Sequence, residues 1–107
     1  MCSIFSCGPA TSSCGRPRWA KLTAAVTDLP SIAAAAHDGG AEAVTLINTL
    51  PGIALDLETR RPVLGAGSGG LSGEAIHPVA VKAVWDVHAA LPDLPIVGVG
   101  GVTTGDD

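Results

Sequence analysis

Residues 43–49 read AVTLINT, an aliphatic and β-branched run that ends in an amide and a hydroxyl side chain. Such a run is typical of a strand that is buried on both faces of a parallel sheet. In parallel α/β folds, ligands bind at the carboxyl ends of the strands. The run therefore predicts a buried strand at residues 43–48 whose last positions face a ligand.

Working outward, the neighbouring segments predict two more strands and a helix. Residues 19–23 (WAKLT) and 95–99 (PIVGV) are short apolar runs of the same kind. Between the first two strands, Asp28 can cap the free amides of a helix over residues 28–38. Gly39-Gly40 ends that helix, since glycine is the preferred residue after a helical C-terminus.

A second helix is predicted over residues 74–90, because apolar residues recur there at helical spacing. A long connection, residues 48–72, separates it from the preceding strand and is rich in glycine and proline. Connections of this length in compact domains are usually functional or disordered. Within it, residues 53–57 and 62–64 are predicted to form a small hairpin.

The resulting order is strand, helix, strand, long connection, helix, strand. Alternating strands and helices predict parallel βαβ units. We therefore expect an α/β fold, a partial (β/α)8 TIM barrel of about three parallel strands with intervening helices. A complete barrel needs about 250 residues, so 107 residues are expected to be an internal piece of one. Residues 1–18 lack any period and are expected to be an unrelated or disordered leader, which leaves 19–107 as the partial barrel.

The composition narrows the class of protein. Hydrophobic residues make up 47% and charged residues 15%, which is typical of a globular chain. A net charge of −4 without a basic run argues against nucleic-acid binding. No apolar stretch is long enough to span a membrane, and no secretory leader is evident, so a cytoplasmic protein is expected.

The cysteine and histidine residues do not predict a metal site. Cys2, Cys7 and Cys14 have spacings that match no common zinc or iron–sulfur pattern. The three histidines, His37, His77 and His88, are not spaced as metal ligands either, and we expect structural roles for them. No metal is therefore predicted.

Polar and glycine residues gather at the predicted carboxyl ends of the strands. Lys21 ends the first strand, and Asn48 and Thr49 end the second. Two glycine-rich turns, 69–73 and 100–101, are expected to lie on the same rim. Glycine lets backbone amides approach an anion closely, so a shared phosphate site is predicted. Ordinary turn glycines, a surface lysine and a turn-forming asparagine remain the alternatives.

Several segments resemble, in the same order, motifs of class 1 dihydroorotate dehydrogenases. They are WAKLT (19–23) followed by VTD (26–28), LINTL (46–50), ALDLETRRP (54–62), GGLSG (69–73) followed by AIHP (75–78), and PIVGVGG (95–101). Each motif is weak alone, but the ordered set covers residues 19–107 and is specific. The hairpin motif and the INT triplet resemble class 1B, whose catalytic subunit works with an electron-transfer partner.

The resemblance implies FMN as the cofactor and oxidation of dihydroorotate to orotate in de novo pyrimidine (UMP) biosynthesis. By matching motif, the residues expected to contact FMN are Lys21, Ile47, Gly73, Gly100 and Gly101. Asn48 and Thr49 are expected to bind the substrate ring. The implied partners are dihydroorotate or orotate and an electron-transfer subunit with FAD and an iron–sulfur cluster. A homo-oligomer is expected for the intact relative.

The sequence also departs from the family pattern. Ala24-Ala25 stand where the family has Pro-Asn, and the motif of the catalytic base, a cysteine, has no match. Cys7 cannot take the place of the family's catalytic cysteine, because it lies too close to Lys21 in the sequence to leave room for the intervening helix. No catalytic residue is therefore identified. We expect the 107-residue chain alone to be inactive and to bind FMN weakly or not at all. The alternatives are another FMN- or phosphate-binding barrel, such as a dihydropyrimidine dehydrogenase-like domain, or a non-functional truncated fragment.

Overall fold

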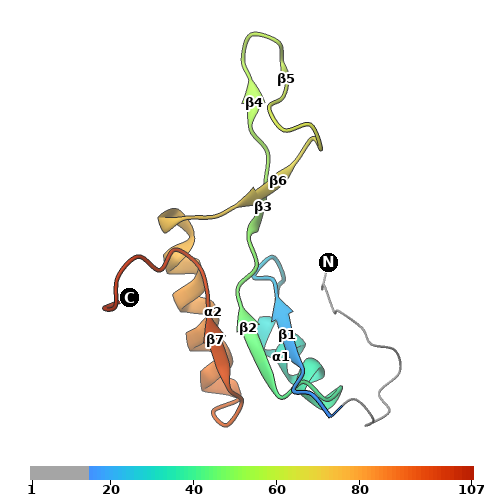
Figure 1. The fold of residues 1–107 in the computed structure, drawn as a ribbon, viewed down its shortest axis with the longest axis vertical. Coiled ribbons are helices and arrows are strands. Elements are labelled where there is room, and N and C mark those ends of the chain that lie inside the picture. Colours follow the sequence, from blue (N-terminus) through green and yellow to red (C-terminus); the bar gives the residue numbers. More distant parts are fainter. Residues whose placement is uncertain (1–14) are drawn as a thin grey trace.

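A computed structural model describes residues 15–107 of the chain. Its main sheet consists of β1 (Trp19–Leu22), β2 (Ala43–Leu46) and β7 (Ile96–Gly98), in the order β1-β2-β7 (Figure 1). Both pairings are parallel. The prediction of three parallel strands is confirmed, with each strand slightly shorter than expected.

Two helices connect the strands. Helix α1 (Leu29–Asp38) begins after Asp28, whose carboxylate accepts a hydrogen bond of 3.1 Å from the Ser31 amide. Helix α2 (His77–Ala90) follows a single 3-10 turn, η1 (Glu74–Ile76). Both helical segments lie where the sequence predicts them.

The core lies between the sheet and the two helices, which pack against the strands and against each other. Leu22, Val44 and Leu46 are buried on the sheet side, and Ala33 and Val87 are buried on the helix side. The residues between these positions point to the opposite face, because side chains alternate along a strand. Lys21, Thr45 and Val97 are register partners across that face.

Residues 50–71 form an arm that projects away from the sheet (Figure 1). At its base, β3 (Leu50–Gly52) pairs antiparallel with β6 (Gly69–Leu71). At its tip, β4 (Leu55–Asp56) pairs antiparallel with β5 (Arg61–Pro62), as the predicted hairpin requires. The prediction of one glycine-rich turn over residues 69–73 is wrong for the first three residues, which form β6. Only Gly73 directly precedes the 3-10 turn η1 that leads into α2.

The residues that follow β7 end in a turn, residues 103–107, whose hydrogen bonds resemble those at the start of a helix. The carboxylate of Asp107 accepts hydrogen bonds of 2.7 Å from the backbone amides of both Thr103 and Thr104. Thr104 and Asp107 thus have the spacing and the backbone contact of a capping box, in which a side chain satisfies the free amide at a helix start. The hydrogen bond from the Thr103 amide is the main reason why the pKa of Asp107 is lowered to about 2.

Removing the cap of α1 tests why this helix starts where it does. Asp28→Ala is expected to lower the free energy of unfolding, because the amide of Ser31 loses its partner. Urea denaturation followed by circular dichroism measures this loss. Asp28→Asn is the matched control, since asparagine caps helices about as well as aspartate. Equal losses in both variants would contradict the capping role.

Acid titration tests the turn held by Asp107. Because the pKa of Asp107 falls from 3.8 to about 2 on folding, its contribution to stability is complete above pH 3.8. It is lost as the pH falls toward 2, when the carboxylate is protonated. We expect a midpoint near 2 for the Asp107 carboxyl carbon in an NMR titration. In Asp107→Asn, the amides of Thr103 and Thr104 should no longer follow this titration; a midpoint near 3.8 would contradict the turn.

Candidate functional site

The carboxyl ends of the three parallel strands meet at a hollow of about 370 Å³. Every site residue predicted from the sequence lines it except Asn48. The lining residues are Lys21, Ile47, Thr49, Ser72, Gly73, Ile76, Gly98, Val99, Gly100, Gly101 and Val102. Residues from four separate parts of the chain thus converge on one rim.

Backbone hydrogen bonds just past the carboxyl ends of the strands hold these parts of the chain together. The Ile47 amide donates to the Val99 carbonyl over 2.8 Å, and the Asn48 amide donates to the Leu22 carbonyl over 2.9 Å. The parallel ladder therefore continues beyond β2 on both sides. Asn48 is half-buried at this point, beside the hollow but outside its lining.

The two predicted glycine turns are in direct contact. Gly101 has a φ of +68°, and a Cβ placed on it would lie 2.8 Å from the Gly73 carbonyl oxygen. It would also lie 2.8 Å from the Cβ of His77. Only glycine fits, both because of the positive φ and because of this close approach. Gly73 itself has a φ of +90°.

The rim offers donors for an anion. Within residues 15–107, no carbonyl or side chain accepts a hydrogen bond from the backbone amides of Gly73, Gly100 or Gly101. Lys21 is the only charged residue among the described residues that line the hollow. Free amides of successive glycines beside the start of a helix are a common way of binding phosphate. The rim can therefore hold one phosphate-sized anion, with a lysine nearby.

The arm fixes Thr49 at the same rim. The side chain of Thr49 lies against the backbone of Gly70 in β6, and any side chain at Gly70 would overlap it. Thr49 precedes β3, so the antiparallel pairing of β3 with β6 places its hydroxyl at the edge of the hollow. The sequence does not predict this contact, because Gly69 and Gly70 are typical of a turn and here lie in a strand.

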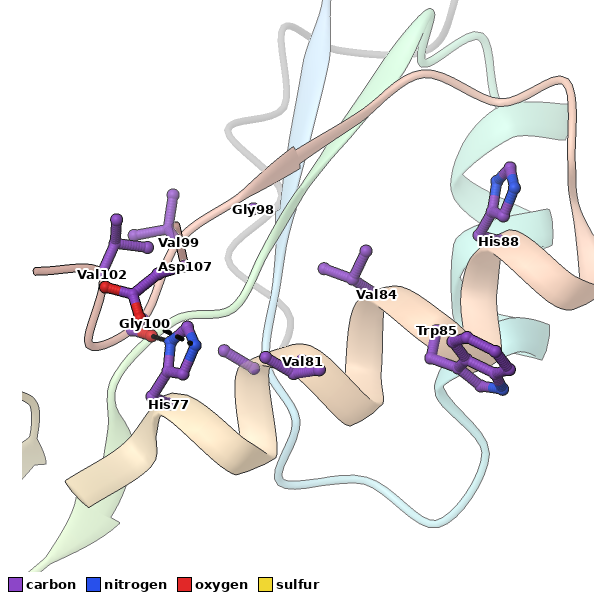
Figure 2. Close-up of a pocket in the computed structure, with 11 residues that line it drawn as sticks. His77, Val81, Val84, Trp85, His88, Gly98, Val99, Gly100, Val102 and Asp107 are labelled. Atoms are coloured by element: carbon purple, nitrogen blue, oxygen red, sulfur yellow. Dashed lines mark hydrogen bonds and ion pairs between the residues drawn. The ribbon is translucent and has the colours of Figure 1, made fainter. Parts of the chain in front are cut away.

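A second groove, of about 450 Å³, lies on the other side of the β7 turn, along α2 (Figure 2). Its lining from the helix is mostly apolar and includes Val81, Val84 and Trp85. At one end, the ring of His77 lies between Gly100 and Asp107. Sequence reasoning missed this contact of His77, whose partner is 23 residues away in the chain.

The described residues contain neither a metal-binding cluster nor a membrane-spanning helix. No three His, Cys, Asp or Glu side chains of residues 15–107 lie close enough together to hold a metal ion. None of the helices in this part of the chain combines the length and apolar character needed to cross a membrane. Cys2, Cys7 and Cys14 lie outside the described residues, and so does most of the predicted leader.

Comparisons with known proteins agree with the motifs. The family model for dihydroorotate dehydrogenase matches residues 9–107, and so begins ahead of Trp19. The chain is 54% identical over 91 residues to the catalytic subunit of dihydroorotate dehydrogenase B (NAD(+)) from Methanosarcina acetivorans, which covers 85% of the chain and 29% of that relative. The same type of subunit from Desulforudis audaxviator is 53% identical over 85% of the chain and 29% of the relative.

A relative of a second type is equally similar. Dihydroorotate dehydrogenase A (fumarate) from Lactiplantibacillus plantarum is 54% identical over 86% of the chain and 30% of its own length. The chain thus spans under a third of the length of these relatives. Because the family model matches nearly the whole chain, including every residue that lines the hollow, the chain belongs to the dihydroorotate dehydrogenase family.

Proposed function

We propose that residues 19–107 form the phosphate-binding and substrate-facing part of an FMN-dependent dihydroorotate dehydrogenase site. The reaction is the oxidation of dihydroorotate to orotate in pyrimidine biosynthesis. The observation that carries the proposal is the convergence of Lys21, Gly73 and Gly100-Gly101 on one hollow. The parallel sheet with both helices on one face supports its place in a (β/α)8 barrel, whose sites lie at the carboxyl ends of the strands.

The residues at the hollow fit FMN. The free amides of Gly73, Gly100 and Gly101 would hold its phosphate, and the ammonium group of Lys21 would contact the flavin ring. Ile47, which is only 2% exposed, would form the apolar floor beneath the ring. When bound, FMN supplies the acceptor for the hydride that leaves dihydroorotate.

Asn48 and Thr49 would orient the substrate ring. An asparagine amide both donates and accepts hydrogen bonds, as the imide edge of orotate requires. Thr49 adds a hydroxyl, for which the missing side chain at Gly70 leaves room. No residue of 19–107 matches the family's base, so a proton acceptor is missing from this set. We therefore propose that the 107-residue chain alone does not turn over. We also propose that it binds FMN weakly, because the three-stranded sheet of the described residues cannot close into a barrel around the flavin.

The partner subunit, the location and the oligomeric state of the intact protein are also proposed, from the resemblance to the family. The relatives named as B-type catalytic subunits support a partner subunit. That this partner carries FAD and an iron–sulfur cluster is proposed from the resemblance to class 1B alone. The A-type relative, named for fumarate, makes a different electron acceptor the alternative. We further propose a cytoplasmic location and a homo-oligomer for the intact protein.

An NMR titration with FMN tests the proposed phosphate site. FMN should shift the amides of Gly73, Gly100 and Gly101 with a dissociation constant on the order of 1 mM, equivalent to about −4 kcal/mol. Riboflavin, which lacks the phosphate, should shift them far less. Gly101→Ala should abolish the response, because its Cβ would meet the Gly73 carbonyl.

Gly65→Ala is the matched control, because a Cβ at Gly65 would meet nothing within 4 Å. It should leave the FMN response unchanged. Equal responses to FMN and riboflavin would contradict a phosphate site. Shifts confined to the groove along α2 would place the ligand elsewhere. A response to neither ligand would favour the non-functional fragment.

A chimera tests the reaction itself. Residues 19–107 would replace the matching segment in the catalytic subunit from Methanosarcina acetivorans, and orotate formation would be followed with an artificial electron acceptor. We expect an active chimera, whereas Lys21→Met in it should lower kcat/KM by at least about tenfold, roughly 1.4 kcal/mol. Lys82→Met, on the exposed face of α2, is the control and should have no effect.

The 107-residue chain is assayed beside the chimera and should form no orotate. Turnover by this chain alone would contradict our proposal that it lacks a proton acceptor. An inactive but folded chimera that binds FMN would instead favour a different substrate, such as that of a dihydropyrimidine dehydrogenase-like domain.

A further inference from the structure

His77 is the first residue of α2, and its half-buried ring reaches across to the turn after β7 (Figure 2). Its Nδ1 atom lies 2.9 Å from the carbonyl oxygen of Gly100. A carbonyl only accepts hydrogen bonds, so Nδ1 must carry the proton and donate. The contact thus ties the start of the helix to the glycine turn.

This hydrogen bond fixes the direction of the next amide. In a planar trans peptide, the carbonyl of Gly100 and the amide of Gly101 point in opposite directions. His77 lines the groove along α2 but not the hollow that contains Lys21. A carbonyl held toward His77 therefore directs the Gly101 amide away from the groove, toward the hollow.

The far side of the ring faces a carboxylate. Nε2 of His77 lies 3.9 Å from Oδ1 of Asp107, whose other oxygen binds the amides of Thr103 and Thr104. This separation is too long for a direct hydrogen bond, so the ring faces the carboxylate without bonding to it. His77 thus lies between the helix start, the glycine turn and the turn that follows.

We propose that His77 is a positioning residue for phosphate binding, acting through the Gly100 carbonyl to aim the Gly101 amide into the hollow. The inference rests on the proposed function for the identity of the ligand as a flavin phosphate. The geometry that carries it is the contact of 2.9 Å between Nδ1 of His77 and the Gly100 carbonyl, made by a residue that lines the groove and not the hollow.

Inorganic phosphate is the probe for the test, followed by NMR on the whole 107-residue chain. His77→Leu cannot donate a hydrogen bond to the Gly100 carbonyl. It should raise the dissociation constant for phosphate, measured from the shifts of the Gly100 and Gly101 amides, by about tenfold, which is the usual effect of losing one hydrogen bond. His77→Asn should restore it to within about twofold, because the asparagine Nδ2 lies as many bonds from Cβ as the histidine Nδ1. Circular dichroism verifies that α2 is intact in each variant.

His88→Leu is the matched control, since His88 lies on the same helix and lines the same groove. It should bind phosphate like the unmodified chain. The ¹⁵N shifts of the His77 ring give an independent readout and should show a proton on Nδ1.

The inference would be overturned by an unchanged phosphate response in His77→Leu, by an unprotonated Nδ1, or by no phosphate response in the unmodified chain. Loss of binding in His77→Asn equal to that in His77→Leu would also overturn it, because the effect would then not depend on the donor. A normal phosphate response together with no response to FMN would refute the proposed cofactor while leaving the role of His77 intact.

Discussion

The close approach of Gly101 to the carbonyl of Gly73 is the constraint on which the site depends. It brings the end of β7 against the start of the second helical segment, where no side chain could fit between them. Gly100 extends the same contact, since a Cβ there would lie 2.7 Å from the Cβ of Ala80. Small residues on both sides let α2 pack close to the sheet, and this closeness places two sets of free amides at one hollow.

The parts of the fold that the sequence predicts well have local causes. Asp28 and Gly39-Gly40 mark the two ends of α1 in consecutive sequence, and the burial of Val44 and Leu46 follows from an apolar run. The pairing of β3 with β6 was missed for the opposite reason. Its strands contain proline and glycine, which rarely form sheet interiors, and in the folded chain Thr49 packs against Gly70 beside this pairing.

In the candidate site, too, some residues could be predicted from the sequence and others could not. Residues at strand ends could be predicted as a group, because parallel strands place their carboxyl ends on one edge, and all but Asn48 line the hollow. The contribution of His77 could not be predicted. Its partner is a backbone carbonyl on another segment, and a backbone group leaves no trace in the identity of its residue.

The arm of residues 50–71 has a consequence for how the molecule opens. Every residue from 51 to 66 is exposed, and the hydrogen bonds of the tip, such as that from the Val63 amide to the Ala54 carbonyl, lie within the arm. Two-stranded ladders without a core are marginal in water, so we expect the arm to open as a separate unit while the parallel sheet stays folded. Mutations at its tip should therefore have little effect on global stability.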